Sequence, residues 1–223
     1  MTSWREIAGD WDRILHDIVS DPKMIAVLNL INSYYKGDTV IYPRQEDVFK
    51  AFKECPYSKL SVVIILQDPY HDGSATGIAM GNEPGTRMSP SLRIVKDTVS
   101  RTIYNREEFD FDPTLVSWSK QGVLLLNTAL TVERGRPLSH QKLWSYFTER
   151  LLIKLSDMNS GVIYCLWGRH AESFRLYINP NSNTILSSAH PVSAAYQGIP
   201  WECDHFIKIN RQLKDFNNLT IKW

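Results

Sequence analysis

Short runs of hydrophobic residues recur along the chain and predict four β-strands. The first run, residues 60–66, is rich in β-branched residues and lacks the polar alternation of a half-exposed strand, which is typical of a strand buried on both faces. Three further runs of this character lie at residues 122–126, 161–166 and 183–187. Strands of this kind favour a parallel sheet that is covered by helices on both sides.

Helical periodicity fills the segments between and around these runs. Hydrophobic residues at helical spacing follow a capping-box pattern, Ser3 with Glu6, and predict a first helix that extends to about residue 18. Asp21-Pro22 predicts the start of a second helix, and Gly37 predicts its end. Further helices are expected at about 47–53, 91–103, 140–156, 169–177 and 203–216.

The alternation of strands with helices predicts right-handed βαβ units. The expected fold class is therefore α/β: one three-layer αβα domain, residues 1–223, with a central four-stranded, mainly parallel sheet flanked by helices. No linker, internal repeat or low-complexity segment interrupts the sequence. The pattern does not determine the order of the strands in the sheet.

Composition and charge mainly exclude certain classes of protein. The formal net charge is +1, so overall charge gives no argument for nucleic-acid binding. The three cysteines are far apart and predict reduced thiols in a cytoplasmic protein, or one of the nucleus or a host-cell compartment, rather than a disulfide framework or zinc site. The N-terminal sequence lacks the hydrophobic region of a signal peptide, and no stretch is apolar for long enough to span a membrane.

Polar and aromatic residues follow all four predicted strands. Ligands of open parallel sheets bind outside the carboxyl ends of the strands, so we expect these segments to converge on one site. Taken alone, each residue has a plain interpretation as a turn, cap or loop residue. Together they favour a shared active site. They are Gln67, Asp68, Tyr70 and His71 after the first strand, Asn127 and Thr128 after the second, Trp167 and Gly168 after the third, and His190-Pro191 after the fourth.

A metal site is the main competing interpretation of these residues. Asp68, His71 and His190 are side chains of the type that binds a divalent ion. No H-x-E or H-E-x-x-H pattern supports such a site, and neither a phosphate-binding glycine loop nor a nucleophile elbow occurs. We therefore expect neither a metal ion nor a cofactor.

Several motifs, in the same order, resemble the family 1 uracil-DNA glycosylases over roughly residues 41–198. Residues 67–71, QDPYH, are similar to the water-activating motif of that family, and residues 122–132 to its uracil-recognition strand. The resemblance implies an enzyme that flips uracil out of single- or double-stranded DNA and hydrolyses its N-glycosidic bond in base excision repair, leaving an abasic site. A monomer without membrane association is expected, and binding of a protein inhibitor of such enzymes stays open.

The resemblance implies a role for each matching residue. Asp68 would stabilise the oxocarbenium-like sugar and orient water, and His190 would donate a hydrogen bond to uracil O2. Asn127 would read the edge of uracil with its amide, and Tyr70 would exclude the methyl group of thymine. The other expected contacts are Gln67 and Met80 with the base, and Ser91, Gly168, Arg169, Val192, Ser193 and Ala194 with DNA.

Four departures from the family pattern leave the substrate preference open. Met80 stands where the family has an aromatic residue under the flipped base, and segment 72–77 is one residue short. The loop after His190 lacks the wedge leucine of the family, which predicts a preference for single strands or weak pairs. Leu66 replaces a glycine, and Arg169 a serine. A glycosylase for a modified pyrimidine, or a non-catalytic DNA-binding or replication accessory protein, are the alternatives.

Overall fold

Four parallel strands form the central sheet of the computed structural model, which describes residues 9–223. The strand order is β3-β2-β5-β6, and all three pairings are parallel. The strands are β2 (Val62–Leu66), β3 (Val123–Asn127), β5 (Ile163–Trp167) and β6 (Thr184–Ser188). Each lies within two residues of the hydrophobic run that predicts it, so the α/β fold class and its parallel sheet are confirmed.

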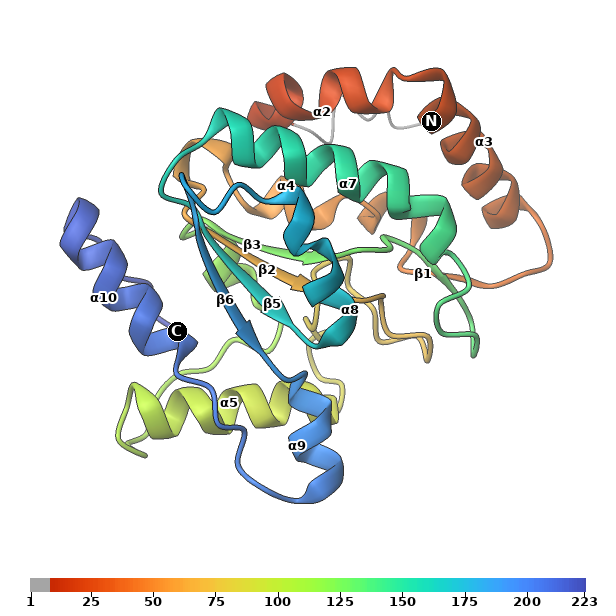
Figure 1. Cartoon of the computed structure of the whole chain (residues 1–223). Coiled ribbons are helices and arrows are strands. Elements are labelled where there is room, and N and C mark those ends of the chain that lie inside the picture. The colour runs from red at the N-terminus through yellow and green to blue at the C-terminus, as the bar shows by residue number, and fades with distance from the viewer. Residues whose placement is uncertain (1–8) are drawn as a thin grey trace.

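Helices cover both faces of this sheet and make a three-layer architecture (Figure 1). On one face lie α2 (Asp12–Val19), α3 (Pro22–Lys36), α4 (Lys50–Glu54) and α7 (Gln141–Met158), and on the other lie α5 (Pro90–Thr102), α6 (Val116–Ser119) and α10 (His205–Asn217). Side chains alternate between faces along a strand. Val63 and Ile65 therefore enter the first core, whereas Val62 and Ile64 enter the second. Burial on both faces explains why β2 contains no polar residue.

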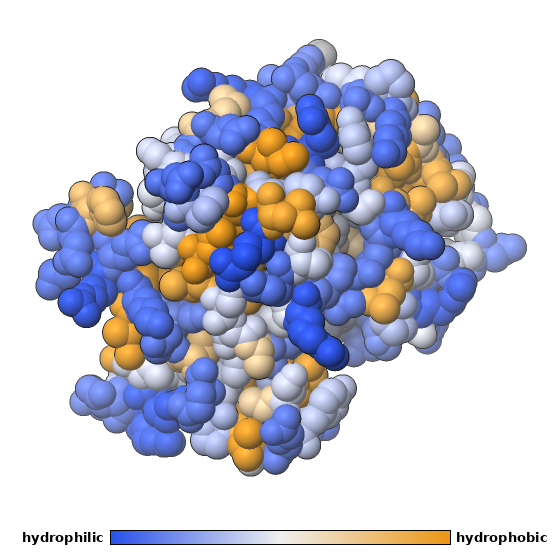
Figure 2. All heavy atoms as spheres, viewed as in Figure 1, coloured by the Kyte–Doolittle hydropathy of each residue, from blue (hydrophilic) through white to orange (hydrophobic). Residues whose placement is uncertain are grey.

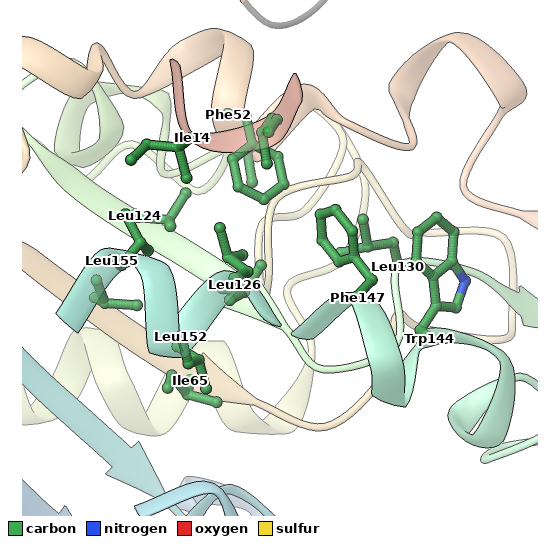
Figure 3. Packing of buried hydrophobic residues seen from close by; sticks show 14 of the residues in the cluster. Ile14, Phe52, Ile65, Leu124, Leu126, Leu130, Trp144, Phe147, Leu152 and Leu155 are labelled. Atoms are coloured by element: carbon green, nitrogen blue, oxygen red, sulfur yellow. The ribbon is translucent and has the colours of Figure 1, made fainter. Parts of the chain in front are cut away.

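An aromatic cluster fills the first core beneath α7 (Figure 3). The Phe147 ring lies edge-on to Phe49, Phe52 and Trp144, with ring centroids 6.0, 6.0 and 5.5 Å apart. Edge-on aromatic pairs of this kind add stability beyond the area that they bury. The cluster therefore connects α7 with the segment that leads into β2.

The three cysteines are buried and unpaired, which agrees with the prediction of reduced thiols.

The second helix follows its predicted signals closely. The Asp21 carboxylate accepts a hydrogen bond from the Lys23 backbone N–H at 2.8 Å, and α3 ends at Gly37. The first predicted helix is described only in its later part, as the 3-10 helix η1 (Gly9–Trp11) and α2. The capping-box pattern of residues 3 and 6 lies outside the described residues.

Three local predictions need correction. The segment predicted as a helix over 47–53 is a 3-10 helix, η2 (Gln45–Asp47), followed by α4. The helix predicted over 169–177 is a short α8 (Arg169–Glu172) that continues as the 3-10 helix η4 (Ser173–Tyr177). The segment after His190 is a helix, α9 (Pro191–Gln197), rather than a loop. Proline at the first position and Gly198 as the left-handed C-cap are the signals that favour this helix.

Some small elements have no counterpart in the hydrophobic pattern. Strands β1 (Ile41–Tyr42) and β4 (Val132–Glu133) form a short antiparallel pair, and η3 (Tyr57–Lys59) precedes β2. Two or three residues are too few to show a period. Such elements form because their flanking segments are already held in place.

The strand order creates a switch point between β2 and β5. The chain leaves β2 through α5 and α6 toward β3 on one side, and it leaves β5 through α8 toward β6 on the other. At such a point the loops diverge and leave a crevice outside the carboxyl ends of the strands. Helices α8 and α9 follow the arrowheads of β5 and β6 at this edge (Figure 1).

The face of the molecule seen in Figure 2 carries hydrophobic residues in separate small groups among hydrophilic ones. Isolated exposed apolar side chains of this kind are normal on protein surfaces. Phe216, near the end of α10, is an exposed apolar side chain, with 74% of its surface accessible. Within residues 9–223, no helix is both long and apolar enough to cross a membrane.

Replacement of Phe147 by alanine should lower the free energy of unfolding by about 3–5 kcal/mol, because a fully buried ring leaves a cavity. Urea denaturation followed by circular dichroism measures this loss. Phe216→Ala is the matched control and should change stability by less than about 0.5 kcal/mol. Equal losses in both variants would contradict the placement of the core beneath α7.

Candidate active site

A cavity of about 1070 Å³ opens at the carboxyl ends of the four strands. Eleven of the residues predicted for the site line it: Gln67, Asp68, Tyr70, Met80, Ser91, Asn127, Gly168, Arg169, His190, Val192 and Ser193. Ala194 does not line the cavity. Its side chain is only 6% exposed and packs in the second core, so a DNA contact of this side chain is not retained.

Asp68 lies in the loop after β2, and its carboxylate is held by one backbone group. Its Oδ2 accepts a hydrogen bond from the Leu138 N–H at 2.8 Å. Burial raises the pKa of Asp68, while the Leu138 bond and the nearby His71 and His170 act in the opposite direction. A partly desolvated carboxylate interacts more strongly with a positive charge than one in bulk water. The position of Asp68 therefore suits the stabilisation of a cationic reaction centre.

His190 lies at the N-terminus of α9, and one hydrogen bond determines its tautomer. Its Nδ1 accepts a hydrogen bond from the Val192 N–H at 3.1 Å. Burial lowers the pKa of His190, which favours the neutral ring. A neutral ring with Nδ1 as acceptor carries its hydrogen on Nε2. His190 therefore offers the cavity a neutral N–H donor.

Gly168 allows the close approach of His190 to the end of β5. A Cβ atom at residue 168 would lie 3.0 Å from the His190 Cβ, and the backbone there has φ +98°. This region of φ favours glycine. A side chain at this position would displace the histidine from the cavity wall.

Asn127 ends β3, directly opposite Leu66 in the parallel register. It is 8% exposed and lines the cavity. Within residues 9–223 its side-chain amide makes no hydrogen bond, which leaves one donor and one acceptor side available to a ligand. The amide atoms stay accessible at the cavity, so they can form hydrogen bonds with a ligand.

Tyr70 and Met80 form one wall of the cavity and contact each other. The Tyr70 hydroxyl lies 2.6 Å from Ser89 Oγ and donates a hydrogen bond to the Met80 carbonyl at 3.4 Å. Burial raises the pKa of Tyr70 to about 12, so the phenol is neutral. Met80 is 6% exposed and has a left-handed backbone with φ 62°, which is rare for a residue other than glycine. Such conformations cluster at functional sites.

The groups expected to contact DNA lie on two sides of the cavity. Ser91 is buried at the N-terminus of α5, where the helix dipole favours an anion such as a phosphate. Arg169 is exposed on α8, and Val192 and Ser193 are half-buried on α9. An additional residue of this rim is Tyr196, whose side chain is 83% exposed.

The sequence analysis missed three groups of this site. The Leu138 N–H is a backbone group, and nothing in its side chain indicates that it holds a carboxylate 70 residues away. Tyr196 falls in a segment without a strand end, so no positional rule selects it. His170 lies two residues beyond Gly168, the glycine after the third predicted strand, and the rule of strand ends, extended by those two residues, would have found it.

The alternative metal site is not formed. Within the part of the chain that the structure describes, no three histidine, cysteine, aspartate or glutamate side chains lie close enough together to hold a metal ion. The ligand set of Asp68, His71 and His190 is therefore not assembled.

A half-buried carboxylate, an imidazole and an amide without a protein partner line one cavity, an arrangement that suits an enzyme acting on a polar substrate. Residues 52–214 match the model of the uracil DNA glycosylase superfamily. The chain is 37% identical over 218 residues to the uracil-DNA glycosylase of Aliivibrio salmonicida, with 96% of each chain covered. It is 36% identical over 218 residues to that of Coxiella burnetii, with 96% of this chain and 93% of the relative covered.

The solved structures agree with these sequence comparisons. The crystal structure of mimivirus uracil-DNA glycosylase matches with a TM-score of 0.86 at 26% identity, over 96% of this chain and 86% of that one. This chain belongs to the uracil-DNA glycosylase superfamily.

Replacement of Asp68 by asparagine should raise the melting temperature at pH 7. The pKa of Asp68 is raised above 3.8 in the folded chain. As the pH rises from the pKa of the unfolded chain through that of the folded chain, ionisation of Asp68 therefore lowers the free energy of unfolding. The increase in the melting temperature of the variant should therefore become smaller as the pH falls to about 4. Each kcal/mol of stability corresponds to about 2–4 °C. Scanning calorimetry at several pH values measures this difference.

Asp112→Asn is the control of opposite sign. Burial acts to raise the pKa of Asp112, but hydrogen bonds from Thr114 and Ser117 outweigh it and lower the pKa. This variant should melt below the wild type at pH 7, with a difference that disappears in acid. A loss of stability in Asp68→Asn at pH 7 would contradict the desolvation of Asp68.

Proposed function

We propose that this chain hydrolyses the bond between uracil and deoxyribose in DNA and leaves an abasic site. One observation carries the proposal: Asp68, His190 and Asn127 come from three strand ends and line the same cavity. Membership of the uracil-DNA glycosylase superfamily supports it. The target base leaves the stack and enters this cavity, because the reacting bond is not accessible inside a duplex.

Asp68 stabilises the positive charge that develops on the sugar, and His190 stabilises the negative charge that develops on the base. The bond between C1′ and uracil N1 breaks, the electron pair goes to the base, and the sugar becomes oxocarbenium-like. The Asp68 carboxylate stabilises that cation and orients a water molecule toward C1′. The Nε2–H of His190 donates to uracil O2, where the negative charge of the leaving base collects. The oxygen of the attacking water bonds to C1′ and its proton passes to the Asp68 carboxylate, which returns it to solvent. The uracil anion takes up a proton from solvent, so the products are free uracil and an abasic sugar.

Asn127 and Tyr70 select the base. Uracil presents an N3–H donor and an O4 acceptor, and one orientation of the Asn127 amide pairs with both, whereas cytosine presents the reverse order. The Tyr70 ring is held by its hydroxyl contacts with Ser89 and Met80, which makes it a rigid wall. A rigid ring against C5 excludes the methyl group of thymine.

The DNA strand runs along the rim of the cavity. Ser91 at the N-terminus of α5 and Arg169 on α8 contact phosphates, while Gly168 keeps the wall open for the backbone. Val192 and Ser193 face the base stack from α9. Two solved structures of mimivirus UNG variants are complexes with UGI. A protein inhibitor of this kind is therefore a candidate partner of this chain.

The direct test is the release of free uracil from matched single-stranded and double-stranded oligonucleotides with a chelator present. We expect release from both, faster from single strands, because the first turn of α9 has Val192 and Ser193 where the family has a leucine that wedges a duplex open. Asp68→Asn and His190→Ala are the inactive controls, each about 10²-fold slower or more with DNA binding intact. Intact binding without release would instead favour a modified base or a non-catalytic role.

A second test concerns base selection. Tyr70→Ala should gain release of thymine, because it removes the ring that blocks the C5 methyl group. Tyr70→Phe is the matched control: it keeps the ring, loses the hydroxyl contacts, and should still reject thymine. Mass spectrometry of the released bases measures both. Rejection of thymine by Tyr70→Ala would assign the exclusion to another group.

A further inference from the structure

We propose that His170 is a positioning residue that holds the backbone of Asp68 through the hydroxyl group of Thr128; this inference rests on the proposed hydrolysis. His170 lies on α8, is half-buried, and lines the cavity. Thr128 follows β3 and is 2% exposed. Neither side chain has a role in the mechanism described above.

The contact between the two side chains determines the direction of their hydrogen bonds. Thr128 Oγ1 donates to the Gln67 carbonyl at 2.8 Å and lies 2.8 Å from His170 Nε2. A hydroxyl group has one hydrogen. Because that hydrogen goes to Gln67, the hydroxyl accepts from His170, and the imidazole carries its hydrogen on Nε2. The bonds therefore run in one direction, from His170 through Thr128 to Gln67.

Burial favours a neutral His170 ring, and a hydrogen on Nε2 requires a rotated Gln141 side chain, because the Gln141 nitrogen lies nearest that ring atom. Burial lowers the pKa of His170, although the negative charge of Asp68 acts to raise it. The Gln141 amide of α7 lies 3.0 Å from the same ring nitrogen. The Nε2–H of His170 meets a hydrogen-bond acceptor when the Gln141 amide turns its oxygen toward the ring. Rotation of the amide by 180° exchanges its oxygen and nitrogen atoms.

This network acts on Asp68 because the Gln67 carbonyl belongs to the peptide group that joins the two residues. That peptide group is planar, so a hydrogen bond that fixes its oxygen also restrains the backbone nitrogen and Cα of Asp68. The oxygen accepts from Thr128 Oγ1 and also from the Ala129 N–H at 3.0 Å. The Leu138 N–H holds the other end of Asp68, at its carboxylate. The residue is therefore held at its backbone and at its side chain.

His170 keeps the Thr128 hydroxyl pointed at Gln67. With an N–H donor on its oxygen, the hydroxyl has no competing direction for its own hydrogen, and successive hydrogen bonds strengthen each other. Without that donor the hydroxyl rotates freely and the Gln67 carbonyl loses part of its restraint. Misplacement of a catalytic group by about 1 Å costs as much as about 10²-fold in rate.

A packing role for the ring is the competing explanation, and two variants separate it from hydrogen bonding. The His170 ring lies edge-on to Phe174, with centroids 5.5 Å apart. His170→Phe keeps a ring there and removes the N–H. His170→Gln removes the ring and places an amide N–H at a similar reach toward Thr128.

The experiment measures kcat and KM for uracil release from a single-stranded oligonucleotide, with the melting temperature of each variant. His170→Phe should lower kcat about tenfold or more while KM stays within about twofold. His170→Gln should recover most of that kcat. Thr128→Val should lose kcat to a similar extent, and the double variant His170→Phe with Thr128→Val should be no slower than Thr128→Val alone, because both changes break one chain of bonds.

Three results would overturn the proposal. The first is wild-type kcat in His170→Phe, and the second is a loss in His170→Gln as large as in His170→Phe, which would assign the effect to packing. Multiplicative losses in the double variant would also overturn it, since the two residues would then act independently. Absence of uracil release from the wild type would instead reject the proposed function. An active wild type with an unaffected His170→Phe rejects only the role of His170.

Discussion

The parallel register of β2 between β3 and β5 is the constraint on which the site depends. Leu66 lies opposite Asn127, and Ile65 lies opposite Leu126 on one side and Leu166 on the other. Parallel strands in register end at one edge of the sheet, so the segments that follow them start side by side. A shift of one residue would turn every strand side chain to the other face and separate these segments. The two cores that hold the register therefore also hold the site.

Burial gives the two central ionisable groups opposite properties. It raises the pKa of Asp68 and lowers that of His190, so one group is a carboxylate with little solvent and the other a neutral donor. Burial of the ionised carboxylate is unfavourable for folding, whereas burial favours the neutral imidazole, and both states are useful for a reaction that separates charge. The left-handed backbone of Met80 is another local cost at the same cavity. These destabilising features lie next to a sheet that is buried on both faces, and the burial of that sheet stabilises the fold enough to compensate for them.

The departures from the family pattern have different consequences in the structure. Leu66 is part of the sheet: it is paired with Asn127, is 3% exposed, and its carbonyl accepts the Thr128 N–H at 3.1 Å. Met80 lies in the cavity wall where the resemblance places it. The segment after His190 differs most, since a helix replaces the expected loop. That helix buries Ala194 and leaves Tyr196 exposed at the rim.

Much of this molecule follows from the sequence by itself. The four strands, most of the helices and eleven of the twelve proposed site residues follow from hydrophobic runs, helix signals and motifs, because each of these is written in neighbouring residues. The strand order, the Leu138 N–H on Asp68 and the contact of His170 with Thr128 do not. They join residues that are 42 to 70 positions apart or depend on backbone groups that every residue carries. Only the packing of both cores decides which of those groups meet, and so only the tertiary structure determines how the catalytic carboxylate is held.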